Sequence, residues 1–222
     1  MKTLRKDDGR DFDLMNWVVT FTGRVFCPLE PDPADVCIED IAHHLSLKCR
    51  FGGASREFYS VAQHSVHCAD HVAASGHPAA VQMAALLHDA GEAYLPDIVQ
   101  PIKHRFFTGN SSPAQVYPIG FASSENRVMS AVIIALNVCI DIKHPAVKTA
   151  DLVMLASEAK ALMDLSKCPP WNLPPESDWA PGGALHRNWN VVPVPPAAAE
   201  RLFLHRFKTL QAAMATQKRD DK

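Results

Sequence analysis

The sequence predicts a compact all-α protein, and three observations support this prediction. Apolar residues recur at helical spacing over most of the chain, as at Ile38, Ile41 and Leu45, which is the pattern of a helix with one buried face. Residues that start and stop helices flank several of these stretches. Of the 222 residues, 47% are hydrophobic, which is enough for one substantial core. We therefore expect a single domain over residues 1–222.

Composition and charge exclude several functional classes. The formal net charge of −2 lacks the basic excess of a general nucleic-acid binder, so we expect no polymeric nucleic acid as a partner. The charged N-terminus is not followed by an apolar signal core, and no run approaches the roughly 20 apolar residues of a membrane span. The six cysteines form no CxxC pair and no zinc-finger spacing. Reduced cysteines in a cytoplasmic protein fit this pattern best.

Residues 1–37 are expected to form an appendage to the helical part. The stretch 1–13 is polar, and we expect it to be loose. Residues 17–26 are mostly apolar or β-branched around Gly23, which predicts a short extended segment that forms a small hairpin. Regular structure is then interrupted by three prolines, Pro28, Pro31 and Pro33.

The helical core is expected over about residues 38–165. Its first helix follows the apolar spacing noted above and ends near Arg50. Ser60 followed by Gln63 is a capping-box pattern, which predicts that a second helix begins there and runs to about Ser75.

Three more core helices follow. Pro78 suits the opening turn of a helix, and the apolar run after it leads to His88 and Asp89 near the end of that helix. Helical spacing returns over residues 124–139 and again over 145–165.

Two connections are expected to be irregular. Residues 95–118 are rich in Pro, Gly and Ser, which predicts a loop that faces the substrate. Residues 166–222 comprise a Pro/Trp/Gly-rich loop, 169–196, and an amphipathic C-terminal helix, 197–216. The apolar side of that helix is predicted from five residues, Leu202, Phe203, Phe207, Leu210 and Met214.

A metal site is predicted from residues that can bind metal on three of these helices, at His64, His88-Asp89 and Asp151. Two neutral imidazoles and two carboxylates leave coordination positions open to water, and this mixed set suits Mn²⁺, Co²⁺, Ni²⁺, Fe²⁺ or Zn²⁺. The sequence therefore predicts one divalent metal ion. Asp141 is the main alternative to Asp151 as the last ligand.

This ordered H…HD…D set, with Glu92 and Asp97 after it, resembles the HD-domain superfamily of metal-dependent phosphohydrolases over roughly residues 38–165. The resemblance is closest to bacterial HD-type 5'-deoxynucleotidases and to phage-type HD deoxynucleoside triphosphate triphosphohydrolases. It rests on five segments: Cys49-Arg50-Phe51, Tyr59-Ser60-Val61-Ala62-Gln63-His64-Ser65, His88-Asp89-Ala90-Gly91-Glu92-Ala93, Asp97 and Pro101-Ile102-Lys103. It implies a compact HD-domain core that hydrolyses a phosphate ester of a small nucleotide. A nucleoside 5'-monophosphate is the leading substrate, and the deoxy form is preferred by analogy.

Two carboxylates are candidates for proton transfer. Glu92 lies four residues after His88 and three after Asp89, so on a continuous helix it would share their face and could exchange a proton with the attacking water. The resemblance implies that Asp97 orients the sugar hydroxyl or assists this transfer.

Three further residues are candidates for binding the phosphate. The resemblance implies that Arg50 and Lys103 lie near the phosphate, where cationic groups neutralise its charge. His67, one helical turn after His64, could supplement them.

Other readings remain open at this point. Within the enzyme class, the alternative is release of inorganic triphosphate from a deoxynucleoside triphosphate, which requires more cationic groups near the phosphates. A hydrolase of cyclic or guanosine-tetraphosphate messengers is a further option, although the chain has no GYP motif. From another class, the domain could be a non-catalytic nucleotide-binding module. The final helix offers apolar surface, and related HD nucleotidases commonly form pairs, so a homodimer is a further alternative.

Overall fold

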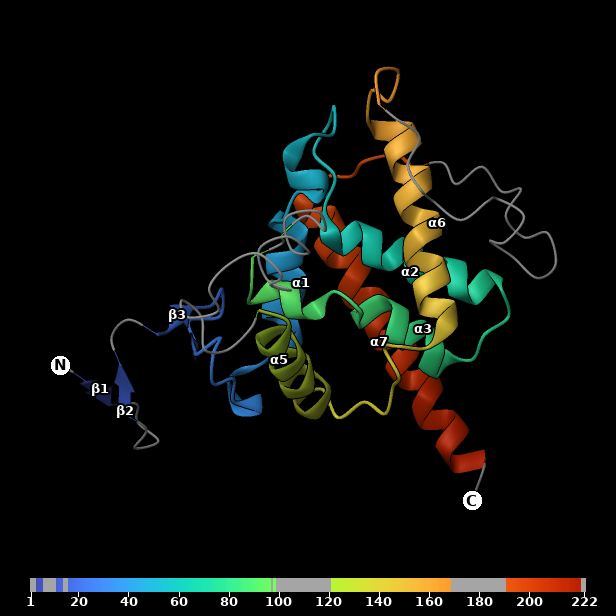
Figure 1. Ribbon diagram of the computed structural model, residues 1–222. Helices are drawn as coiled ribbons and strands as arrows, with labels where there is room; N and C mark the ends of the chain where they lie inside the picture. The colour runs from blue at the N-terminus through green and yellow to red at the C-terminus, as the bar shows by residue number, and fades with distance from the viewer. Residues whose placement is uncertain are drawn as a thin grey trace. The chain divides into compact units, whose positions relative to one another are not determined.

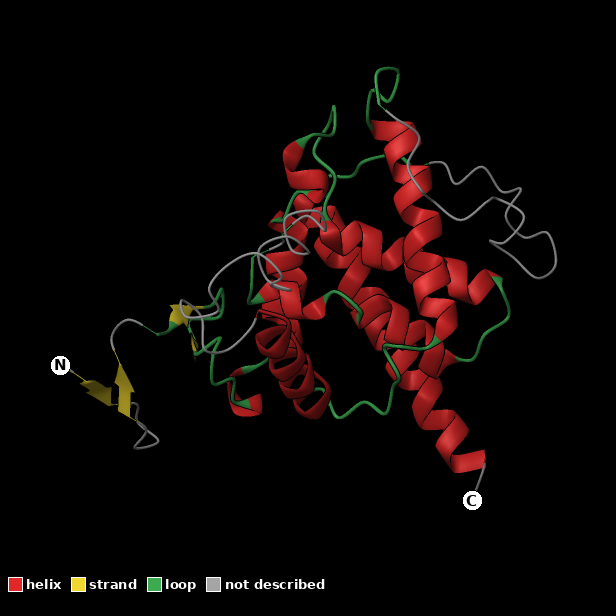
Figure 2. Ribbon diagram, viewed as in Figure 1, coloured by secondary structure: helices red, strands yellow, loops and turns green. Residues whose placement is uncertain are grey.

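The computed structural model confirms the all-α prediction. Helices account for most of the described residues, and the described strands form two short two-stranded sheets (Figure 2). The structure describes six ranges of residues, with backbone alone for the first two and for 218–220: 3–5, 11–13, 16–96, 98, 121–168 and 191–220.

Contacts divide the chain into two compact units. Unit 1 comprises residues 1–44 and 90–138, and unit 2 comprises residues 45–89 and 139–222, so the division falls within helix α1 (Ile38–Leu47). The prediction of one domain over the whole chain stays a prediction.

Unit 1 contains both sheets. The hairpin predicted over residues 17–26 is confirmed, because β3 (Val18–Val19) pairs antiparallel with β4 (Val25–Phe26) around Gly23, whose φ is +81°. The expectation of a loose start was wrong for residues 3–5 and 11–13, since β1 (Thr3–Arg5) pairs antiparallel with β2 (Asp11–Asp13). Each of these strands alternates polar, apolar and polar residues, which is the two-residue period of a strand.

The described helical part of unit 1 includes residues 38–44 of α1, two 3₁₀ turns and α5 (Phe121–Ala135). The turn η1 (Pro33–Asp35) and the turn η3 (Ala90–Ala93) both contact α5. Gly91 allows η3 to pack closely against α5, because a Cβ atom there would lie only 3.2 Å from the sulfur of Met129.

Unit 2 holds the helices that carry the predicted ligands (Figure 1). Among its elements, α2 (Val61–Ala74) contacts α3 (Ala79–Leu87), α6 (Pro145–Leu162) and α7 (Pro196–Asp220), and α3 also contacts α6 and α7. The short turn η2 (Arg50–Gly53) precedes α2.

The predicted capping of α2 is confirmed. Ser60 is its N-cap, and the Ser60 side chain accepts a hydrogen bond from the backbone N–H of Gln63 at 3.1 Å. Just after the helix, Gly76 has a φ of +79°, a backbone conformation that glycine adopts at helix ends without steric cost. The cap fixes where the helix begins, and so fixes His64 in its first turn.

The helix that leads to the HD pair is shorter than predicted. Pro78 is the N-cap of α3, and the helix ends at Leu87 with His88 as its C-cap. Residues 90–93 form the separate 3₁₀ turn η3. The condition under which Glu92 would share the face of His88, one continuous helix, is therefore not met.

The C-terminal helix packs into unit 2 through one side. Ala199, Phe203, Phe207 and Leu210 of α7 are buried, as predicted for the last three, but Leu202 is 44% exposed and does not belong to that side. A spacing of three to four residues from Ala199 leads to these buried positions and passes over Leu202. None of the described helices is both long and apolar enough to cross a membrane.

Candidate metal centre

Four predicted metal ligands come together in unit 2. His64 lies in the first turn of α2, His88 caps the end of α3 with Asp89 directly after it, and Asp151 lies in the second turn of α6. Because each of these helices contacts the other two, the fold brings side chains from distant parts of the sequence to one place.

The spacing of their donor atoms fits a shared cation. His64 Nε2 lies 3.5 Å from Asp151 Oδ1 and 3.8 Å from Asp89 Oδ2. His88 Nε2 lies 3.3 Å from Asp89 Oδ2 and 4.0 Å from Asp151 Oδ1. Ligands that each bind one metal ion at about 2.0–2.2 Å are separated from one another by roughly 3–4 Å.

Hydrogen bonds orient both imidazoles so that Nε2 faces the two aspartates. His64 Nδ1 donates to Glu158 Oε1 at 2.8 Å, and His88 Nδ1 donates to the backbone carbonyl of Ala85 at 2.7 Å. A proton held on Nδ1 leaves the lone pair of a neutral ring on Nε2, the form that binds metal. The Nε2 atom of His88 is buried and has no hydrogen-bond partner among the described residues. A cation would satisfy it.

The carboxylates form the accessible side of this cluster. The His64 side chain is fully buried, whereas those of Asp89 and Asp151 are 21% and 26% exposed. Water or a small ligand therefore reaches the cluster past the two aspartates.

Glu158 is a fully buried carboxylate behind His64. Its Oε1 accepts hydrogen bonds from His64 Nδ1 and, at 2.9 Å, from the hydroxyl of Tyr59, and its Oε2 lies 3.2 Å from Nε of Arg50. Burial alone would raise the pKa of Glu158, but the charges of His64 and Arg50 and these hydrogen bonds outweigh it and hold the pKa below its usual range. The residue is therefore ionised at neutral pH.

The surroundings of Asp151 and His64 also favour a positive charge in the cluster. Burial raises the pKa of Asp151, yet His64, His88 and Lys148 lower it well below its ordinary value. Burial and the charge of Arg50 lower the pKa of His64. Its acidic neighbours raise that pKa by a larger amount, so the net shift is upward. Both shifts have the direction expected of a site that favours a cation among ionised carboxylates.

Two cations lie beside these acidic groups. Arg50 Nη1 lies 3.8 Å from Asp89 Oδ2, so the buried guanidinium bridges Asp89 and Glu158. Lys148 Nζ lies 2.9 Å from Asp151 Oδ2 and is largely exposed. The predicted contact of Arg50 with a phosphate stays a prediction.

His67 contacts the same network from the far side of Tyr59. Its Nδ1 lies 2.9 Å from the Tyr59 hydroxyl, which already donates to Glu158, so His67 Nδ1 donates to the hydroxyl. Burial lowers the pKa of His67. Its predicted contact with phosphate stays a prediction.

The structure favours Asp151 over the alternative, Asp141. Asp141 is exposed, and its Oδ1 accepts a hydrogen bond from the backbone N–H of Lys143 at 2.9 Å within a turn before α6. Asp151, in contrast, lies within 4.0 Å of both ligand histidines.

The other three predicted site residues lie in unit 1 or outside the described residues. Glu92 lies in η3 of unit 1, half-buried, and its role in proton transfer stays a prediction. Asp97 and Lys103 lie outside the described residues, as do most of the 95–118 loop and residues 169–190.

Sequence reasoning missed two residues of the cluster, Glu158 and Cys68. Glu158 follows Val147, Ala150 and Met154 along the buried side of α6, and a lone carboxylate in an apolar helical stripe was the available signal. Cys68 lies one helical turn after His64, and the Sγ of Cys68 and the ring nitrogens of His64 and His88 lie within 4.8 Å of one another. Spacing of four residues was the signal there.

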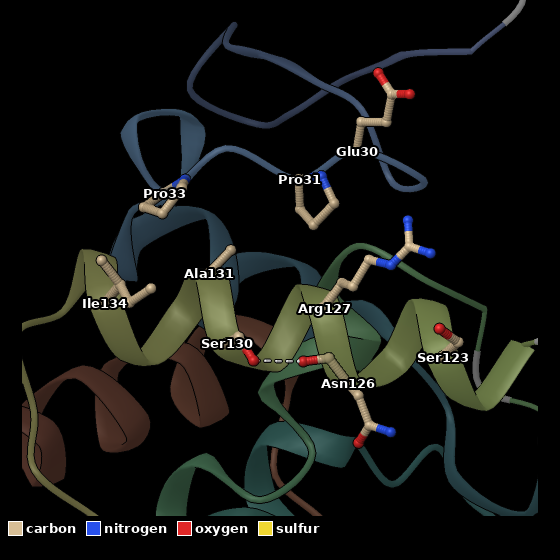
Figure 3. A pocket seen from close by; sticks show the side chains of 9 residues that line it. All are labelled: Glu30, Pro31, Pro33, Ser123, Asn126, Arg127, Ser130, Ala131 and Ile134. Carbon is tan, nitrogen blue, oxygen red and sulfur yellow. Dashed lines mark hydrogen bonds between the residues drawn. The ribbon is translucent and has the colours of Figure 1, made fainter. Parts of the chain in front are cut away.

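Unit 1 has a separate groove, with a volume of about 460 Å³, between the loop before η1 and helix α5. Figure 3 shows Pro31 and Pro33 on one wall and Arg127, Ala131 and Ile134 on the other. Its nine lining residues, all described, include no histidine or cysteine and one carboxylate, Glu30. The groove therefore lacks the donors of a metal site.

Comparison with known proteins identifies relatives along most of the chain. The chain is 34% identical, over 198 residues, to the uncharacterized protein YfdR of Escherichia coli (strain K12). The aligned region covers 88% of this chain and 96% of YfdR. The chain belongs to the YfdR family. An uncharacterized protein of Rhodobacter capsulatus is 31% identical over 159 residues, covering 68% of this chain and 75% of its own length. No family model matches the chain. Similarity to YfdR spans all three helices of the cluster, since the aligned region covers 88% of this chain.

Proposed function

We propose that this member of the YfdR family is a divalent-metal-dependent phosphohydrolase that acts on small nucleotides, with His64, His88, Asp89 and Asp151 as the metal ligands. One observation supports it most: two imidazoles, one fully buried and one 11% exposed, present the Nε2 atom to a pair of aspartates at separations of 3.3 to 4.0 Å. Such a mixed nitrogen and oxygen set suits Mn²⁺, Co²⁺, Ni²⁺, Fe²⁺ or Zn²⁺.

A divalent ion in this position supplies two kinds of chemistry, since it lowers the pKa of a water molecule and polarises a phosphoryl oxygen. The protein's own groups prepare that position. Glu158 keeps the proton of His64 on Nδ1, and Ala85 does the same for His88. Arg50, 13% exposed, brings a fixed positive charge to within 3.8 Å of Asp89, where it can offset charge that develops on a phosphate.

Nucleotide hydrolysis is proposed from the resemblance of the H…HD…D pattern to HD-domain phosphohydrolases. A nucleoside 5'-monophosphate is the first choice of substrate. The two cations beside the cluster, Arg50 and Lys148, suit one phosphate better than three, because each phosphate group in a chain adds charge to be neutralised. Glu92 is proposed as the proton-transfer group on the strength of its place in the sequence.

The test is hydrolysis by protein stripped with chelator and then reloaded with one metal at a time. Incubation with a panel of ribo- and deoxynucleoside mono- and triphosphates, followed by ³¹P NMR of the products, should give inorganic phosphate from a monophosphate. We expect His88→Ala to abolish turnover and to reduce bound metal. His205→Ala, which changes an exposed histidine of α7, is the matched control and should retain both.

The outcomes separate the alternatives. Release of inorganic triphosphate with monophosphates left intact would replace the nucleotidase with a triphosphohydrolase. Stoichiometric metal and nucleotide binding without any phosphorus product would replace the enzyme with a binding module. Hydrolysis that survives complete removal of metal would refute the proposal.

A further inference from the structure

Cys68 lies against the candidate metal centre but has no role in the function proposed above. It is on α2, one turn after His64, and its side chain is fully buried. Its Sγ lies 3.5 Å from Nε2 of His64 and 3.9 Å from Nδ1 of the same ring. The sulfur therefore lies beside the imidazole ring at similar distances from both nitrogens, slightly nearer to the Nε2 atom that faces the aspartates.

The sulfur also fits the geometry of the cluster as a whole. The ligand atoms of His64, Cys68 and His88 all lie within 4.8 Å of one another, as donors to one ion do. In the metal-free arrangement the thiol can donate its proton to His64 Nε2, the atom that would bind the ion. A cation on that nitrogen would replace this hydrogen bond and would leave the sulfur of Cys68 close to the ion.

We propose that Cys68 Sγ is a fifth donor to the cation that the proposed function assigns to His64, His88, Asp89 and Asp151, and that it gives this site a preference for Zn²⁺ and Co²⁺ over Mn²⁺. On binding, the S–H bond breaks, the proton leaves to solvent and a metal–sulfur bond forms, with no change of oxidation state. Thiolate sulfur is a soft ligand that favours zinc, whereas manganese prefers oxygen. The inference rests on the proposed cation and not on hydrolysis.

The balance of charge agrees with a thiolate in this position. The three carboxylates of the cluster, Asp89, Asp151 and Glu158, oppose two cationic side chains, Arg50 and Lys148. A divalent ion added to this set leaves one net positive charge. A Cys68 thiolate cancels it, which lowers the electrostatic cost of holding the ion in a largely buried site.

Cobalt absorption spectroscopy tests this assignment. Chelator-stripped full-length protein is titrated with Co²⁺ alone. We expect visible ligand-field bands that saturate at one ion per chain, together with a near-ultraviolet band from sulfur-to-cobalt charge transfer. Cys68→Ser and Cys68→Ala should lose the near-ultraviolet band and keep the visible bands. Cys139→Ser, which changes an exposed cysteine, is the matched control and should keep both.

Metal preference provides the second measurement. Losing even an outer partner of a ligand lowers metal affinity by about 10- to 100-fold, so Cys68→Ser should weaken Zn²⁺ binding at least about tenfold. Binding of Mn²⁺, for which sulfur is a poor ligand, should change by less than about threefold. Equal losses for both ions would contradict the inference.

The spectra distinguish this inference from the function on which it rests. Visible bands without a near-ultraviolet band in the wild-type protein would refute the role of Cys68 and leave the four-ligand centre standing. A wild-type protein that binds no Co²⁺ stoichiometrically would refute both. Because the wild-type spectrum alone decides between these results, the test does not depend on how well a Cys68 variant folds.

Discussion

Replacing Glu158 by glutamine should weaken metal binding and destabilise the protein together. Glu158 is fully buried and accepts hydrogen bonds from His64 and Tyr59 while facing Arg50 at 3.2 Å. The amide of the Glu158→Gln variant has only one acceptor oxygen. Its NH₂ group must therefore face either the two donors, His64 and Tyr59, or the guanidinium of Arg50. Removing one partner of a buried ion pair lowers the free energy of unfolding by about 3–5 kcal/mol. Because the amide keeps one acceptor oxygen, we expect a loss near the lower end of this range, at about 3 kcal/mol. Loss of the bond to His64 should lower metal affinity by about 10- to 100-fold.

Urea unfolding and metal titration measure the two effects, and Tyr59→Phe is the control. That variant loses one hydrogen bond to a carboxylate, worth about 1.5–3 kcal/mol, but keeps the bond between His64 and Glu158. It should therefore be less stable than the wild type with nearly unchanged metal affinity. Folded Glu158→Gln protein that binds metal as tightly as the wild type would refute the reasoning. Equal weakening of metal binding in Tyr59→Phe would show that the effect does not pass through His64.

Two further predictions concern other carboxylates. Asp151→Asn should weaken Zn²⁺ and Mn²⁺ binding at least about tenfold in a competition titration, because an amide oxygen lacks the charge of the carboxylate ligand. The control variant, Asp141→Asn, should bind both ions as the wild type does. The reverse result would assign the last ligand to Asp141. For Asp40 in unit 1, burial raises the pKa, but hydrogen bonds from Cys37 and Thr22 outweigh this and keep the pKa below its ordinary value. A depressed pKa stabilises the fold above the unfolded pKa of about 3.9, and the contribution is lost as the pH falls through the lower folded value. Asp40→Asn should thus reduce the free energy of unfolding by about 2 kcal/mol at pH 7, with a smaller difference in urea titrations at pH 3; a constant difference at both pH values would be inconsistent with this account.

The helices of unit 2 could be predicted because they depend on local signals, and the candidate metal ligands could be predicted from their order along these helices. The Ser60 cap and the apolar spacing of α2, α6 and α7 are visible within a few turns of sequence, and His64 and Asp151 follow from their positions in those helices. The end of α3 at Leu87 was predicted less well. The short-range pattern continues toward Glu92, but the chain leaves the α-helix and forms a 3₁₀ turn, in which Gly91 packs closely against Met129.

Local signals mark Glu158 and Cys68 as unusual, but they do not determine what these side chains contact. Whether a glutamate in a helix faces water or is buried depends on partners elsewhere in the chain, and those of Glu158 are Tyr59, His64 and Arg50, roughly a hundred residues earlier. A lone cysteine near a histidine is more often part of an apolar core. In both cases the informative observation was three-dimensional: a buried polar group in contact with a predicted ligand.

The central claim, one divalent ion shared by His64, His88, Asp89 and Asp151, is tested most directly by anomalous diffraction at the cobalt edge from crystals grown with Co²⁺. We predict one dominant peak at about 2.0–2.2 Å from Nε2 of both histidines and from an oxygen of both aspartates. A dominant peak at other residues, or no ordered peak in protein that is otherwise well resolved, would contradict the account.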